Sequence, residues 1–168
     1  MLPIIILGIV LGIVIYQDCK DRAINVLTLP VILGMALWYA VEHPLWQWTF
    51  LWFNMGFVGV QLLGLTLYFS VKHWQLVNIT QKYLGWGDIL IFFALSPLFS
   101  PIQFIFFFIG SLIVTLLVVF LYHQLVRPLP TIPLAAAFSA TTLIYGLVLY
   151  FKQLSSYNDW IILAYFYG

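Results

Sequence analysis

The sequence predicts an all-α, polytopic membrane protein with about six transmembrane helices and its N-terminus outside. Of its 168 residues, 64% are hydrophobic and only 7% are charged, and the mean hydropathy is +1.09. Water-soluble domains average roughly 45–50% apolar and about 25% charged residues, so a soluble globule is excluded. At about 20 residues per span, the chain accommodates about six helices as a single membrane-embedded domain over residues 1–168, with no room for an extramembrane domain.

Apolar runs define the expected helices, and polar or proline-containing stretches separate them. In chain order these runs cover residues 2–17, 27–41, 48–71, 89–99, 102–123 and 134–151. The fourth is short because Ser100 and Pro101 stop it. The first has no basic residue before it, so we expect a retained helix rather than a signal peptide. The aromatic tail at 160–168 is too short to span.

The basic residues predict the orientation. Five fall in the first, third and fifth connections, and the sixth falls on the opposite side; the five are Lys20, Arg22, Lys72, Lys82 and Arg127, and the sixth is Lys152. Short loops rich in Lys and Arg stay on the cytoplasmic side. We therefore expect a multi-pass protein of the cytoplasmic (inner) membrane with its N-terminus outside.

Composition excludes several functional classes. The formal net charge is +1, which is not the basic surface of a nucleic-acid-binding protein. Cys19 is the single cysteine, and no CxxC pair or Cys/His cluster with zinc spacing occurs. The three histidines, His43, His73 and His123, are scattered over both sides and suggest no ligand set. We expect neither a metal nor another cofactor.

Two of the five acidic residues stand out. Asp18 follows the first expected helix and Asp88 precedes the fourth, so both lie at the cytoplasmic boundary although 70 positions (88 minus 18) separate them. A charged side chain near the bilayer costs about 2.5–3.5 kcal/mol and is a functional candidate. Glu42 and Asp159 fall on the outer side, and Asp21 can pair with its basic neighbours in water. Residue patterns alone also allow Asp18 as a loop residue and Asp88 as a helix N-cap.

The surroundings of Asp88 fit a catalytic pair. Two carboxylates within hydrogen-bonding distance hold one proton between them, so one acts as base toward a water while the other acts as acid toward a carbonyl. This is the chemistry of aspartyl peptide hydrolysis. Gly85 and Gly87 flank Trp86 just before Asp88, and a missing Cβ allows close approach of a backbone or helix and a positive φ.

Three segments resemble motifs of one family. Residues 18–25 read Asp-Cys-Lys-Asp-Arg-Ala-Ile-Asn, residues 85–88 read Gly-Trp-Gly-Asp, and residues 132–135 read Ile-Pro-Leu-Ala. They resemble segments of the type IV prepilin peptidases and archaeal preflagellin peptidases, which are membrane aspartyl proteases with a GxGD motif. The resemblance places Asp18 and Asp88 on the two catalytic aspartates.

The resemblance also implies a function. It is to the short, peptidase-only members, since the chain lacks the cytoplasmic insertion with two CxxC pairs that accompanies N-methylation in larger members. The implied activity is removal of a short basic leader from a prepilin or pseudopilin at the cytoplasmic membrane face, without metal, cofactor or methyltransferase activity. Gly85, Gly87 and Arg22 would support the motifs, and Trp86 and Lys82 are candidate substrate contacts.

Other functions remain open at this stage. A non-catalytic assembly subunit or small transporter would use the aspartates in an ion path, with carboxylates near the bilayer midplane. The signal-peptide-peptidase and presenilin type shares the GxGD ending, but its first aspartate follows a tyrosine, whereas Gln17 precedes Asp18 here. The particular substrate, the pilus, secretion or adhesion system that it serves, the oligomeric state and the resting position of the proton are left undecided.

Overall fold

The described part of the protein is all-helical, as the sequence predicts. The computed structural model describes residues 2–76, 78–82, 84–125, 132–160 and 163, without the side chains of residues 81, 82 and 125. The elements are α1 (Leu2–Asp21), α2 (Thr28–Glu42), α3 (Trp48–His73), α4 (Ile79–Lys82), α5 (Trp86–Leu95), the 3-10 helix η1 (Ser96–Leu98), α6 (Pro101–Leu125) and α7 (Leu134–Lys152). Within these residues four helices, α1, α3, α6 and α7, are long and apolar enough to cross a membrane, while α2 and α5 with η1 are shorter apolar helices.

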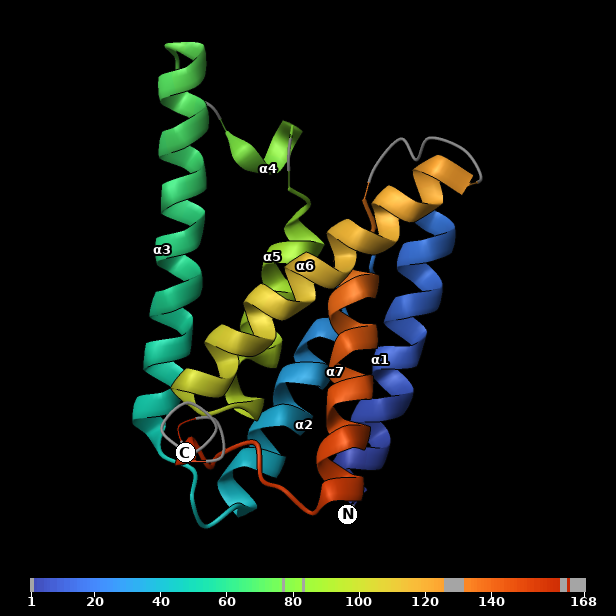
Figure 1. Cartoon of the computed structure of the whole chain (residues 1–168), viewed down its shortest axis with the longest axis vertical. Coiled ribbons are helices and arrows are strands. Elements are labelled where there is room, and N and C mark those ends of the chain that lie inside the picture. The colour runs from blue at the N-terminus through green and yellow to red at the C-terminus, as the bar shows by residue number, and fades with distance from the viewer. Residues whose placement is uncertain (1, 77, 83, 126–131, 161–162, 164–168) are drawn as a thin grey trace.

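Taken in chain order, the helices α1, α2, α3, α5, α6 and α7 run in alternating directions (Figure 1). The ends of α1, α3 and α6 therefore lie in the upper half of the view, and α5 and α7 run downward from below them. Helix α1 packs against α2 and α7, and α2 packs against α5 and η1. Helix α3 stands at the edge, and its buried residues, Leu51, Asn54 and Val58, all lie in its first half.

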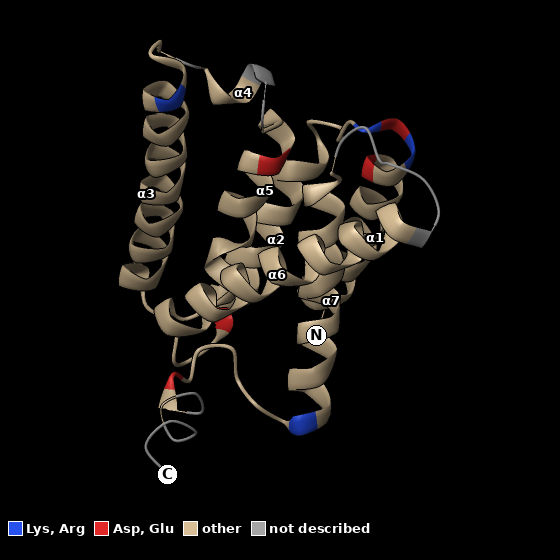
Figure 2. Ribbon diagram, turned by 45° about the horizontal axis from the view of Figure 1, so that its top comes forward, with Lys and Arg blue, Asp and Glu red and all other residues tan. Residues whose placement is uncertain are grey.

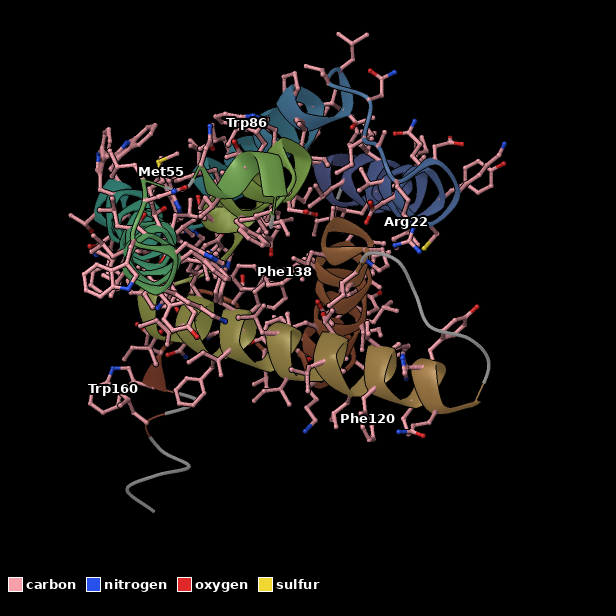
Figure 3. All side chains as sticks on the ribbon, turned by 90° about the horizontal axis from the view of Figure 1, so that it is seen from above. Arg22, Met55, Trp86, Phe120, Phe138 and Trp160 are labelled. Atoms are coloured by element: carbon pink, nitrogen blue, oxygen red, sulfur yellow. The ribbon has the colours of Figure 1, made fainter. Side chains whose placement is uncertain are left out.

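A group of aromatic rings joins α5, α6 and α7. Phe138 of α7 points toward α5 and α6 (Figure 3), and its ring lies 4.6 Å from Phe92, 5.3 Å from Phe108 and 6.0 Å from Phe107, measured between centroids. Tilted and edge-on contacts at these distances are the favourable geometries for aromatic pairs. The core therefore fixes the start of α7 relative to α5.

Several helix boundaries differ from the sequence-based expectation. Helix α1 continues to Asp21, so most of the polar cluster expected between two helices is helical. Helix α5 begins at Trp86 rather than at 89, and the short α4 lies within the expected long loop. Helix α1 includes the polar residues at 17–21 because the side chain of Asp18 is buried against other helices, as described below.

Charged segments gather at the helix ends (Figure 2). Lys20 and Lys72 lie in the last turns of α1 and α3, whereas Lys152 ends α7 at the opposite end of the molecule. The side chain of Lys82 and all of Arg127 lie outside the described residues. The described basic residues are therefore divided between the two ends as the sequence predicts.

A buried amide holds the break between α5 and α6. Pro97 and Pro101 lack the N–H groups that would continue a helix, and at this break the carbonyls of Ser96 and Phe99 accept hydrogen bonds from a side chain. The side-chain Nδ2 of Asn54, which is fully buried, donates to the carbonyls of Ser96 at 2.8 Å and Phe99 at 2.9 Å. One side chain of α3 thus satisfies two buried backbone groups.

We predict that Asn54→Leu lowers the free energy of unfolding by about 2–4 kcal/mol, because two buried carbonyls lose their donor. Gln61→Leu is the matched control, since Gln61 is an exposed amide on the same helix. Thermal unfolding in detergent should show a lower midpoint for the first variant and an unchanged or higher one for the second. Equal midpoints for Asn54→Leu and wild type would contradict this role of Asn54.

Candidate functional site

The start of α7 presents backbone N–H groups that its own helix cannot bind. The N-cap is Pro133 and the helix begins at Leu134. The first helical hydrogen bond comes from Ala137 N–H to the Pro133 carbonyl at 3.1 Å. The N–H groups of Ala135 and Ala136 precede it, and first-turn donors have no acceptor within their own helix.

Both of these donors bind carboxylates from other helices. Ala135 N–H donates to Oδ1 of Asp88 at 2.9 Å, and Ala136 N–H donates to Oδ2 of Asp18 at 2.7 Å. Adjacent residues have Cα atoms about 3.8 Å apart, so neighbouring peptide groups hold the two carboxylates side by side. We call Asp18 and Asp88 the carboxylate pair.

Asp18 reaches this position because it continues the buried stripe of α1. The stripe consists of Pro3, Leu7, Leu11, Val14 and Asp18, at intervals of three or four residues. Such residues share one face of a helix. Asp18 is only 6% exposed, so its interpretation as a loop residue is wrong.

Asp88 lies in the first turn of α5, and its carboxylate accepts hydrogen bonds from two segments of the chain. Its Oδ2 accepts the N–H of Gly85 at 3.2 Å, while its Oδ1 holds Ala135. Gly85 is the N-cap residue of α5, so the expectation that Asp88 itself is the N-cap is wrong. The carboxylate closes the first turn of α5 as the acidic residue of a capping box does.

The glycines of this segment act through close approach and not through unusual backbone angles. None of the described glycines has a positive φ, and Gly85 has φ −67°. A Cβ on Gly87 would lie 2.9 Å from Cδ1 of Ile24. The missing side chain therefore lets the segment after α1 pack against the start of α5. The positive φ that glycine allows is not adopted at Gly85 or Gly87.

The electrostatic environment favours negative charge at this position. The amino-terminal end of a helix carries a partial positive charge, and its N–H groups bind anions. The two carboxylates nevertheless repel each other. Two carboxyl groups held this close to each other can share one proton. The pair can therefore present one acid and one base to a reactant.

Trp86 and Arg22, two further candidate residues, lie within four residues of the carboxylate pair along the chain. Trp86 is 65% exposed and lies on the outer side of α5 (Figure 3). Arg22 is exposed, with φ 53°, and follows the end of α1. The side chain of Lys82 is outside the described residues. Among the residues described, His, Cys, Asp and Glu form no group of three that could hold a metal ion.

Two further acids lie at the opposite end of the molecule. Glu42 ends α2 and accepts a hydrogen bond from the indole N–H of Trp38 at 2.5 Å. Asp159 accepts a hydrogen bond from the hydroxyl of Ser100, which precedes α6. Both have local partners within the fold, so neither adds to the carboxylate pair. Most of the aromatic tail at 160–168 lies outside the described residues.

Comparison of the chain with protein-family models, with curated proteins and with solved structures found no match. The assignment of a function therefore depends on the geometry of the site and on the sequence motifs.

The amides of Ala135 and Ala136 are the part of the site that the sequence analysis missed. A signal was present, since Pro133 followed by Leu-Ala-Ala-Ala is typical of a helix start, and a helix start offers free N–H groups. A second signal was the spacing of Leu7, Leu11 and Asp18 in one apolar stripe. Neither signal predicts that the start of α7 contacts the end of the buried stripe of α1.

We predict that Asp18→Ala destabilises the fold by about 1–3 kcal/mol more than Asp18→Asn does. The Asn amide oxygen can still accept the Ala136 N–H, whereas Ala leaves a buried donor unsatisfied. Thermal unfolding of the two variants measures the difference. Asp21→Ala, at the exposed end of α1, is the control and should change the stability by less than about 0.5 kcal/mol. Equal stabilities for the Asn and Ala variants would show that the hydrogen bond to α7 contributes nothing.

We also predict that Gly87 and Ile24 are energetically coupled. Gly87→Ala should cost about 0.5–1 kcal/mol less in an Ile24→Val background, because Val lacks the Cδ1 atom that the new methyl group would meet. A double-mutant cycle based on unfolding free energies measures this coupling. Gly110→Ala is the control, since a Cβ there meets nothing within 4 Å. An absence of coupling between Gly87 and Ile24 would contradict the close packing.

Proposed function

We propose that this protein is a membrane aspartyl endopeptidase that removes a short basic leader from type IV prepilin-like or pseudopilin-like substrates. The observation that carries the proposal is the binding of Asp18 and Asp88 by the adjacent N–H groups of Ala136 and Ala135. These two hydrogen bonds bring together two carboxylates that lie 70 positions apart in the sequence (88 minus 18). A single catalytic site accounts for both of the motifs in which the carboxylates occur.

The chemistry follows from a shared proton. The ionised carboxylate takes a proton from a water, whose oxygen attacks the carbonyl carbon of the scissile peptide bond. The protonated carboxyl of the pair gives its proton to the carbonyl oxygen, and the tetrahedral intermediate then collapses with protonation of the leaving amine. The N–H groups of α7 hold both carboxylates in position through these transfers.

The position of the pair along the helices supports a peptidase over an ion path. Asp18 lies in the last turn of α1 and Asp88 in the first turn of α5, whereas an ion path needs carboxylates near the bilayer midplane. In the proposed topology six helices cross the inner membrane with the N-terminus outside, so the pair faces the cytoplasmic boundary. A leader retained in the cytosol by its basic residues would meet the pair there.

The test is cleavage of a tagged prepilin-like substrate from the same genome, co-expressed in membranes and followed by mass spectrometry. We expect wild type to remove the leader, and we expect Asp18→Asn and Asp88→Asn to reduce the rate by at least about 10³-fold, since each removes one member of the acid–base pair. The new N-terminus should be unmethylated.

Asp21→Asn is the control variant, because Asp21 is an exposed acid in the same turn of α1. It should cleave at the wild-type rate. Membrane levels and unfolding temperatures of all variants must match, so that loss of activity is not loss of protein. Cleavage that persists in either pair variant would refute the proposed mechanism, and an intact substrate with wild type would favour the non-catalytic alternative.

A further inference from the structure

The buried hydroxyl of Ser139 has no hydrogen-bond partner among the described residues and lies on α7 one turn from the amides that bind the carboxylate pair. Ser139 has no exposed surface, and its Oγ has no hydrogen bond from any described residue. The other buried hydroxyl nearby on this helix, that of Thr142, donates to the Phe138 carbonyl at 2.7 Å. Buried hydroxyls are normally paired with protein or with ordered water, and none of the described residues is the partner of Ser139.

The position of Ser139 relates it to the pair. It follows Ala136 by three residues and Ala135 by four, and all three are buried residues of α7. Residues at these intervals share a helix face and lie about 4.5–6 Å apart along the axis. Helical side chains lean toward the amino-terminal end of their helix, so the Ser139 hydroxyl leans toward the turn whose N–H groups hold Asp88 and Asp18.

We propose that Ser139 holds a buried water that also bonds to a carboxylate oxygen of the pair. A buried water needs two to four polar partners; the hydroxyl supplies one and Asp18 and Asp88 supply the others. The existence of this water does not depend on catalysis. Its role as the water that attacks the peptide bond rests on the proposed function, and in that role Ser139 is a positioning residue.

The competing arrangement is a hydroxyl turned back onto its own helix. Serine in a helix can donate to the carbonyl of the residue four positions earlier, which here is Ala135. In that arrangement Ser139 has no role at the pair, and its replacement by alanine changes neither the site nor its reaction.

The decisive experiment combines a structure with kinetics. Crystal structures of wild type and Ser139→Ala in a lipid mesophase, at a resolution that shows ordered water, should reveal a water within hydrogen-bond distance of Ser139 Oγ and a carboxylate oxygen in wild type only. A Ser139 hydroxyl bonded to the Ala135 carbonyl, with no water between it and the pair, overturns the proposal whatever the activity.

Kinetics then test the positioning role. Ser139→Ala should lower kcat about tenfold, the effect of losing one hydrogen bond of about 1.4 kcal/mol, and should leave KM unchanged. Ser139→Thr should restore kcat because it restores the hydroxyl. Thr142→Val is the matched control, since it removes a buried hydroxyl whose partner lies within α7, and its kcat should stay within about twofold of wild type.

The outcomes separate the two proposals. If wild type leaves the substrate uncut, the proposed peptidase fails while the crystal structures still decide the water site. If wild type cuts and the water is present, but Ser139→Ala retains full kcat, the water is structural and the positioning role is wrong.

Discussion

The site depends on two hydrogen bonds at the start of α7. The N–H groups of Ala135 and Ala136 bind Asp88 from α5 and Asp18 from α1, across 47 and 118 positions of sequence. A helix start inside a protein must satisfy its first N–H groups somewhere, and here two carboxylates satisfy them. The same contacts join three helices, so the two hydrogen bonds that hold the carboxylate pair also connect α1, α5 and α7.

This arrangement explains how carboxylates are tolerated in so apolar a protein. Moving a carboxylate out of water is costly unless hydrogen bonds and opposite charge offset the loss of hydration. The α7 amides provide charge-assisted hydrogen bonds, and the helix end provides partial positive charge. The two acids lie close enough to repel each other when both are ionised, and sharing one proton relieves such repulsion. A structural capping role and an acid–base role are therefore compatible, and the Asn and Ala variants of Asp18 separate them.

The sequence predicted the helical fold and the residues of the pair, but not what holds them together. Hydrophobic runs located the long helices within a few residues, because each apolar segment is bounded by polar residues or proline. The predicted helix boundaries are wrong where tertiary contacts determine them. Helix α1 extends through its polar cluster because Asp18 is buried against α7. Helix α5 starts at Trp86 because the Asp88 carboxylate closes its first turn. The contacts of Ala135 and Ala136 were not foreseeable, since alanine side chains carry no signal of what their backbone N–H groups bind. The buried amide of Asn54 is likewise a feature of packing, as is the hydroxyl of Ser139, which has no hydrogen-bond partner among the described residues.

The most direct test of the account is nuclear magnetic resonance of the protein with ¹⁵N-labelled alanine, following the amide signals of Ala135 and Ala136 as the pH is changed. Hydrogen bonds to titrating carboxylates make both amide protons shift, and coupling within the pair makes them shift over the same pH range. Asp18→Asn should abolish the direct response at Ala136 and alter the range at Ala135, and Asp88→Asn should do the reverse. Amide signals that do not change with pH would contradict the central role of the α7 amides. So would a variant in which the signal of the other alanine keeps its wild-type pH response.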